Sequence, residues 1–139
     1  MPQMRISEYR ESRKPVSTHT MTTTQSDVRD ITSWHAHVYF GPESRDDAWG
    51  LREIVASQFG DRVRIGRFHE RPVGPHPQWS FQIEFLPDEF AGVMSWLALN
   101  HRGLDVFAHP NTDDELRDHR DSAIWIGRSH ALLLSALGG

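Results

Sequence analysis

The sequence lacks cysteine altogether, so it can form neither disulfide bonds nor thiolate metal sites, and it offers no cysteine nucleophile. It also lacks an excess of positive charge, because 15 Lys and Arg residues stand against 19 Asp and Glu residues. The resulting formal charge of -4 disfavours a nucleic-acid partner bound through its phosphates. No apolar run approaches the length that crosses a bilayer, so neither a transmembrane helix nor a membrane partner is expected.

Histidine, in contrast, is abundant, with nine copies among 139 residues. Imidazole changes its charge near neutral pH and is the commonest side-chain metal ligand in proteins. The chain is long enough for one domain and short for two. The composition therefore predicts a single domain with metal or proton-transfer chemistry.

Residues 1–32 are rich in Ser, Thr, Arg and Gln and show no hydrophobic period. We interpret them as a flexible leader, and residues 33–139 as one folded domain. Met21 offers an alternative start of translation within this leader. The leader lacks the apolar core of a secretory signal, which together with the absence of cysteine favours the cytoplasm.

The folded part alternates between strand and helix patterns. The helix between Ser44 and Gly60 is expected to bury Ala48, Leu51, Val55 and Phe59, which recur at helical spacing. A second helix opens at Pro87, and Thr112 with Glu115 forms the capping box of a short third helix. Strands are expected at 34–40, about 62–69, 79–85, 104–108 and 123–126.

This order predicts an α+β fold, the ferredoxin-like βαββαβ sandwich with a C-terminal extension. Its two helices cover one face of the sheet. The other face must then meet water, the extension or a second subunit.

Several polar side chains are predicted to meet on that second face. His35 and His37 lie near the start of the first strand, Glu84 near the end of the third and His109 at the end of the fourth. In the predicted topology the first strand is central and antiparallel to the other two. The start of the first strand therefore lies beside the ends of both neighbours, and three imidazoles and a carboxylate converge.

A His-x-His pair on a strand places two imidazoles on one side, two rises of roughly 3.3 Å apart, within reach of one divalent ion. We therefore predict His35, His37 and His109 as metal ligands. Neutral imidazole suits Fe, Zn, Cu or Ni, and three ligands leave positions open for substrate, as in a catalytic site. His76, held in a rigid loop between prolines, is expected to join the site.

Three stretches together resemble the DOPA 4,5-dioxygenase family, and the similarity covers about residues 33–128. They are WHAHVYF at 34–40, GPHPQWSFQIEF at 74–85 and LDVFAHPNTDDELRDHRDSAIWIG at 104–127. The resemblance implies a ferredoxin-like fold, often dimeric, and an enzyme that opens the ring of a catechol such as DOPA with O₂ at non-haem Fe(II). Zinc or another divalent metal could occupy the site in a purified sample.

In this reading His76 and His119 form the acid/base or substrate-orienting pair, since a loop and a helix can place them over the site. Asp118 could orient a neighbouring imidazole, and Arg120 could hold a substrate carboxylate by a bidentate contact. A typical extradiol iron has two histidines and one carboxylate. If that pattern holds, Glu84 or an Asp of residues 113–121 replaces one histidine.

Other functions would use the same residues. A zinc-dependent hydrolase could activate water at the same histidines. A dimeric, non-catalytic module could bind an aromatic ligand on the open sheet face. In a purely structural reading, every histidine is satisfied in the core or at the surface, and the protein binds no metal.

Overall fold

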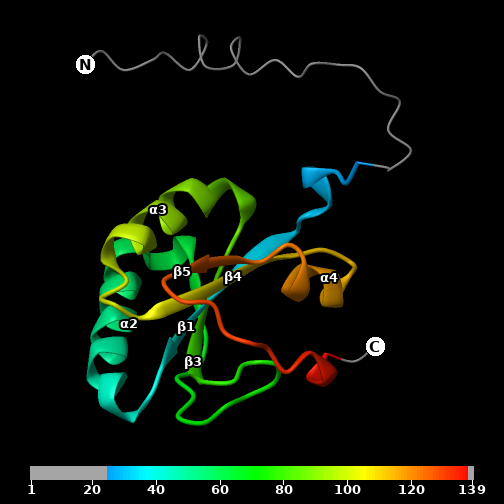
Figure 1. The fold of residues 1–139 in the computed structure, drawn as a ribbon. Coiled ribbons are helices and arrows are strands. Elements are labelled where there is room, and N and C mark those ends of the chain that lie inside the picture. The colour runs from blue at the N-terminus through cyan, green and yellow to red at the C-terminus, as the bar shows by residue number, and fades with distance from the viewer. Residues whose placement is uncertain (1–24, 138–139) are drawn as a thin grey trace, which may run out of the picture.

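The computed structural model describes residues 25–137. It has a five-stranded antiparallel sheet with the order β2-β3-β1-β4-β5, and β1 lies at its centre (Figure 1). The strands are β1 (Ser33–Phe40), β2 (Arg64–Ile65), β3 (Trp79–Phe85), β4 (Asp105–Asn111) and β5 (Ile124–Ile126). The helices are α2 (Arg45–Phe59), α3 (Phe90–Asn100) and α4 (Glu115–Arg120). The coarse part of the α+β prediction, helices combined with an antiparallel sheet, is confirmed.

Helices α2 and α3 pack on one face of the sheet (Figure 1). The buried residues of α2 are the four that helical spacing predicted, and they meet the inward side chains of the central strands. Ala36, Val38 and Ile83 are fully buried in this core. The alternate residues of the same strands consequently point to the other face, where the site lies.

Strand β2 is much shorter than the predicted 62–69. Only Arg64 and Ile65 pair with β3, and Gly66 still donates its N–H to the Gln82 carbonyl at 2.7 Å. The chain then leaves the sheet edge and returns only at His69, in an isolated bridge. An edge strand pairs on one side alone, so the residues before the proline-rich loop lack the support to extend the ladder.

The cap of α4 also differs from the prediction. Asp114, and not Thr112, is the N-cap, and its carboxylate accepts the Arg117 N–H at 3.0 Å. The Thr112 hydroxyl instead donates to Asp118 Oδ1 at 2.7 Å. A carboxylate directly before the helix is a better partner for its positive N-terminal end than a hydroxyl two residues earlier.

Hydrogen bonds attach residues near both ends of the described chain to the domain. Residues 1–24 of the predicted leader lie outside the described residues, but Thr32 donates its N–H to the Asn111 carbonyl at 2.9 Å. At the other end Leu133 donates its N–H to the Pro75 carbonyl at 2.8 Å, and Leu137 is buried. Within residues 25–137, none of the helices is both long and apolar enough to span a membrane.

Candidate active site

The face of the sheet opposite α2 and α3 gathers imidazoles from β1 and β4 and a carboxylate from β3. In the sheet register His35 of β1 is paired with Glu84 of β3 on one side and with His109 of β4 on the other. His37 lies two residues along β1, on the same face. The antiparallel pairing thus brings together residues that are as much as 74 positions apart in the sequence, counted from His35 to His109.

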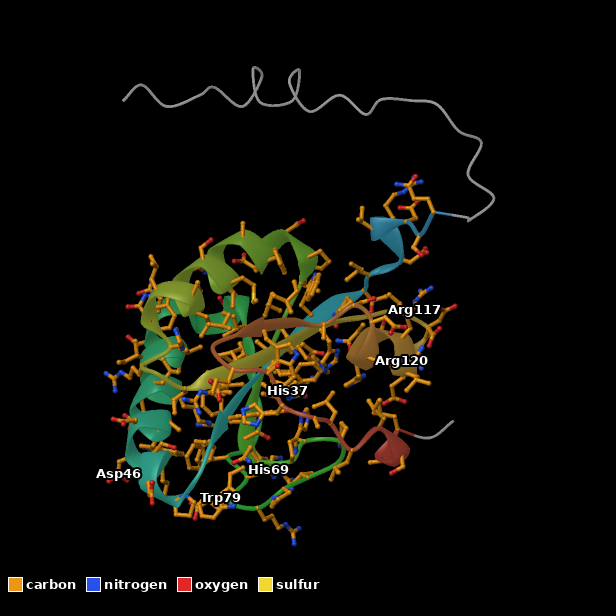
Figure 2. The ribbon with its side chains drawn as sticks, viewed as in Figure 1. His37, Asp46, His69, Trp79, Arg117 and Arg120 are labelled. Atoms are coloured by element: carbon orange, nitrogen blue, oxygen red, sulfur yellow. The ribbon has the colours of Figure 1, made fainter. Side chains whose placement is uncertain are left out.

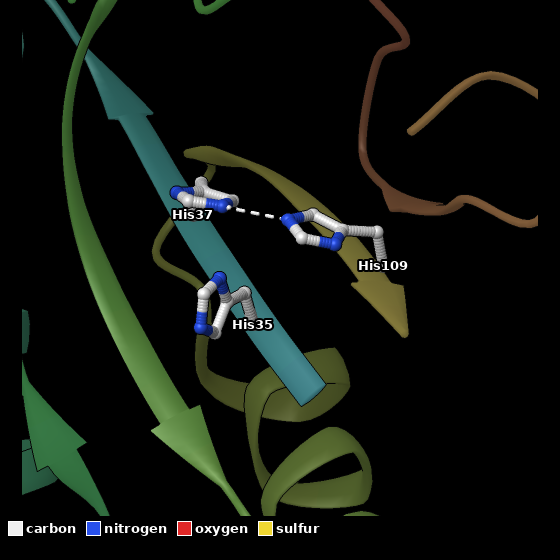
Figure 3. Close-up of side chains that lie close together, drawn as sticks. All are labelled: His35, His37 and His109. Carbon is white, nitrogen blue, oxygen red and sulfur yellow. Dashed lines mark hydrogen bonds between the residues drawn. The ribbon is translucent and has the colours of Figure 1, made fainter. Parts of the chain in front are cut away.

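The three histidines are close enough to hold one metal ion. His37 Nε2 and His109 Nε2 are 3.1 Å apart, and one ligand atom from each of His35, His37 and His109 lies within 4.8 Å of the others (Figure 3). Two nitrogens bound at about 2.1 Å and at right angles to one ion would stand roughly 3.0 Å apart. The observed spacing therefore fits two neighbouring ligands of one metal.

Hydrogen bonds to the far sides of the rings leave nitrogen lone pairs free for that ion. His109 Nδ1 donates to the Pro110 carbonyl at 3.0 Å, so its Nε2 has the free lone pair. His35 Nε2 lies 2.8 Å from the Glu84 carboxylate, which leaves Nδ1 of His35 available. A carboxylate or carbonyl behind a ligating histidine is the usual arrangement at metal centres, because it fixes the ring and its tautomer.

The histidine cluster opens into a cavity of about 390 Å³, within the size range of small-molecule sites. Loop residues before β3, helix α4 and the C-terminal tail complete its walls. It is lined by His35, His37, Pro75, His76, Gln82, His109, Asn111, Thr112, Glu115, Asp118, His119 and Leu137.

His76 and His119 approach the cluster from outside the three central strands. The ring centroid of His76 lies 4.1 Å from that of His37, and the centroid of His119 lies 3.8 Å from that of His109. Each of the two has a fixed partner at Nδ1. The buried Tyr39 hydroxyl is 2.7 Å from His76 Nδ1, and His119 Nδ1 donates to the Glu115 carbonyl at 2.7 Å.

Burial favours the neutral form of His37, His76 and His109. Together with the nearby imidazoles, and as the larger cause, burial lowers the pKa of His76 to about 4 and that of His109 to about 3. Burial also lowers the pKa of His37 well below its ordinary value. The same burial raises the pKa of the Tyr39 phenol, which stays protonated. Neutral imidazole is the form that binds a metal.

These pKa shifts predict that the metal-free protein is acid-labile. Below about pH 6.5 the unfolded chain binds protons that the folded chain takes up only near pH 4 at His76 and pH 3 at His109. The stability that the neutral His76 and His109 rings contribute is therefore fully present above about pH 6.5. It is lost as the pH falls from there toward the pKa values of the folded state. In urea unfolding of chelator-treated protein, we expect the free energy of unfolding to be at least about 2 kcal/mol lower at pH 5 than at pH 7.5. Equal stability at the two pH values would contradict this prediction.

The structure places Asp118 and Arg120 differently from the sequence interpretation. Asp118 is buried, but it accepts both the N–H and the hydroxyl of Thr112, at 2.7 Å each, and so it orders the turn before α4. The side chain of Arg120 is 52% exposed, pairs with Asp121 at 2.9 Å and does not line the cavity. The two roles predicted for these residues have no geometric support.

Sequence reasoning missed Tyr39 and Glu115 as parts of the site. Strand alternation places Tyr39 on the face of His35 and His37, which was a usable signal. Glu115 lies four residues before His119, one helical turn away on the same face. The sequence contained no comparable signal that Leu137 would reach the cavity.

The sequence profile of the Dopa 4,5-dioxygenase family matches residues 34–136, which include nearly every residue of the cavity wall. The chain belongs to this family. The resemblance predicted from the three sequence motifs is thereby confirmed.

Relatives from fungi and a cyanobacterium agree with this membership. The chain is 36% identical over 115 residues to the DOPA 4,5-dioxygenase of Amanita muscaria, covering 78% of this chain and 50% of that protein. It is 35% identical over 114 residues to an uncharacterized 21.2 kDa protein of Botryotinia fuckeliana, covering 74% and 62%. The crystal structure of a candidate dioxygenase from Nostoc punctiforme has 42% identity and a TM-score of 0.78, covering 81% of this chain and 96% of that one. The chain thus spans less than two thirds of the length of either fungal relative.

Proposed function

We propose that this protein is a non-haem Fe(II) extradiol dioxygenase that opens the ring of a catechol such as DOPA with O₂. The observation that supports it most directly is the group of three imidazoles, His35, His37 and His109, at the base of a small-molecule cavity. Family membership supports the reaction class. Imidazole nitrogen is a suitable ligand for iron, and the cavity leaves space beside the three rings for a substrate.

In this proposal His35, His37 and His109 hold the metal, and Glu84 acts behind His35 instead of as a ligand. When bound, a ferrous ion would hold the diol and O₂ side by side and let electrons pass between them. The protein keeps His37 and His109 neutral through burial, and it fixes His35 and His109 through Glu84 and the Pro110 carbonyl. The ligand set is thus oriented before any substrate enters.

The hydrogen bonds at Nδ1 give His76 and His119 opposite roles toward the substrate, one as a hydrogen-bond donor and one as a base. Because a carbonyl can only accept, His119 has its proton on Nδ1 and offers the Nε2 lone pair, as a base for a catechol proton. Among the described residues Tyr39 has no other hydrogen-bond acceptor, so its hydroxyl donates to His76 Nδ1. The His76 proton then lies on Nε2, where it can donate a hydrogen bond to the substrate.

Anaerobic reconstitution tests the proposed reaction. Tag-free protein loaded with Fe(II) and given a catechol is expected to form a yellow ring-opened product only after O₂ is admitted. L-DOPA, caffeate and protocatechuate are the first substrates to assay. Protein loaded with Zn(II) is the control and should give no such product. Cleavage of esters or amides by the Zn(II) protein without O₂ would instead support the hydrolase, and no product from any catechol would contradict the dioxygenase.

The ferredoxin-like topology, the homodimer and the cytoplasmic location, which the sequence interpretation also predicted, are part of the same proposal. We propose a ferredoxin-like homodimer, since the strand order β2-β3-β1-β4 and the two helices on one face are compatible with that fold. Sedimentation of the purified protein tests the dimer. The cytoplasm remains the compartment that the absence of cysteine favours, and localisation of the full chain in cells tests it.

A further inference from the structure

The wall that α4 contributes to the cavity is acidic. Glu115, Asp118 and His119 are three or four residues apart, so they share one face of the helix, and all three line the cavity. Arg117 and Arg120 lie on another face of the same helix. Figure 2 shows both arginines on the side of α4 that points away from His37. The helix therefore presents its negative side chains to the cavity and its positive ones elsewhere.

No positive side chain balances this wall within residues 25–137. Neither Lys nor Arg is among the described residues that line the cavity. Both oxygens of the buried Asp118 are already bonded to Thr112. Glu115, in contrast, is exposed, and its carboxylate makes no hydrogen bond or ion pair among those of the described residues. The carboxylate of Glu115 is thus the negative charge that is available to interact with a ligand substituent near the cavity opening.

We infer that this cavity selects catechols with a neutral or ammonium-bearing substituent over those with a carboxylate, and that Glu115 sets this preference. The inference rests on the proposed function, because it takes a catechol as the ligand. With the diol against the histidines, the ring substituent points away from them toward the opening. An ammonium there is attracted by the acidic wall, whereas a carboxylate is repelled and finds no cation to pair with.

Three catechols of similar size test the inference by binding alone. Dopamine, 4-ethylcatechol and 3,4-dihydroxyphenylacetate have a positive, a neutral and a negative substituent. Their affinities for the Zn(II)-loaded full chain are measured by calorimetry without O₂. We expect dopamine to bind roughly tenfold more tightly than 3,4-dihydroxyphenylacetate, with 4-ethylcatechol between them. Because the effect is electrostatic, the ratio should shrink in 0.5 M NaCl.

Two matched substitutions assign the preference to Glu115. Glu115→Gln should lower the ratio of dopamine to 3,4-dihydroxyphenylacetate affinity at least threefold, by an order-of-magnitude estimate. Glu53→Gln removes the same charge from an exposed position of α2, which packs on the opposite face of the sheet. That control variant should keep the wild-type ratio. A ratio that Glu115→Gln leaves unchanged would overturn the role of Glu115.

The outcomes separate this inference from the proposed function. If the expected binding order is found but the Fe(II) protein opens no ring, the dioxygenase fails and the charge preference stands. If catechols are cleaved but the carboxylate compound binds as tightly as dopamine, the preference fails and the dioxygenase stands. If none of the three catechols binds, the charge preference is overturned, and the O₂-dependent assay of the Fe(II) protein decides the dioxygenase separately.

Discussion

Replacing His37 with alanine is expected to abolish tight metal binding and, with it, ring opening. His37 is almost wholly buried, and its Nε2 lies 3.1 Å from that of His109. Loss of a residue that only orients a ligand costs about 10- to 100-fold in metal affinity, so loss of a central ligand should exceed about 100-fold. Metal content of tag-free protein, measured by elemental analysis after dialysis against Fe(II) and then buffer, gives the result.

The matched control for this substitution is His101→Gln. His101 follows α3, and its Nδ1 donates to the Leu104 carbonyl, away from the cavity lining. The control should keep both metal and activity. Thermal unfolding of the metal-free forms shows whether His37→Ala still folds. Full metal content in a folded His37→Ala protein would exclude His37 as a ligand, and with it the proposed three-histidine site.

Replacing His119 with glutamine should separate proton transfer from metal binding. His119 contacts the His109 ring and offers Nε2 to the cavity, but it lies outside the group of three proposed ligands. General acid–base catalysis by a positioned side chain is typically worth about 10²- to 10⁴-fold, and we expect kcat to fall within that range. The metal content should equal that of the wild type.

Two further measurements decide how His119 acts. A His119→Ala variant should regain part of its turnover when imidazole is added to the buffer, because a free base can enter the space that the side chain leaves. If the metal is lost together with activity, His119 is a ligand and not a base. If kcat falls less than about twofold, well below the range expected of a general base, it has no part in proton transfer.

The differences between expectation and structure have distinct causes. Strand β2 is short because it lies at the sheet edge and pairs with β3 alone. The residue pattern from 62 to 69 favours a strand but does not show that a second neighbouring strand is missing. Arg120 was expected to hold a substrate carboxylate, but a helix of six residues points successive side chains in different directions. Its side chain consequently pairs with Asp121 outside the cavity.

Much of the site could nevertheless be predicted from the sequence, because side chains along a strand alternate strictly between its two faces. Once residues 34–40 form a strand, His35, His37 and Tyr39 must share a face, and the apolar Ala36 and Val38 on the other face indicate the side that packs on the core. The nine histidines and the absence of cysteine then limit the candidate ligands to nitrogen and oxygen. The sequence by itself thus determined the order of elements, the core face of each strand and the chemical type of the ligands.

Only the tertiary structure decided which of these groups lie close together and which hydrogen-bond partner each of them has. The 3.1 Å approach of His37 to His109, the partners of His76 and His119 at Nδ1, and the arrival of Leu137 at the cavity all depend on packing between distant segments. The acidic wall of the cavity also depends on the tertiary structure, because the charge composition does not show which side chains of α4 face the cavity. Local patterns fix directions along a strand or helix, whereas distances and protonation depend on neighbours that only the folded chain supplies.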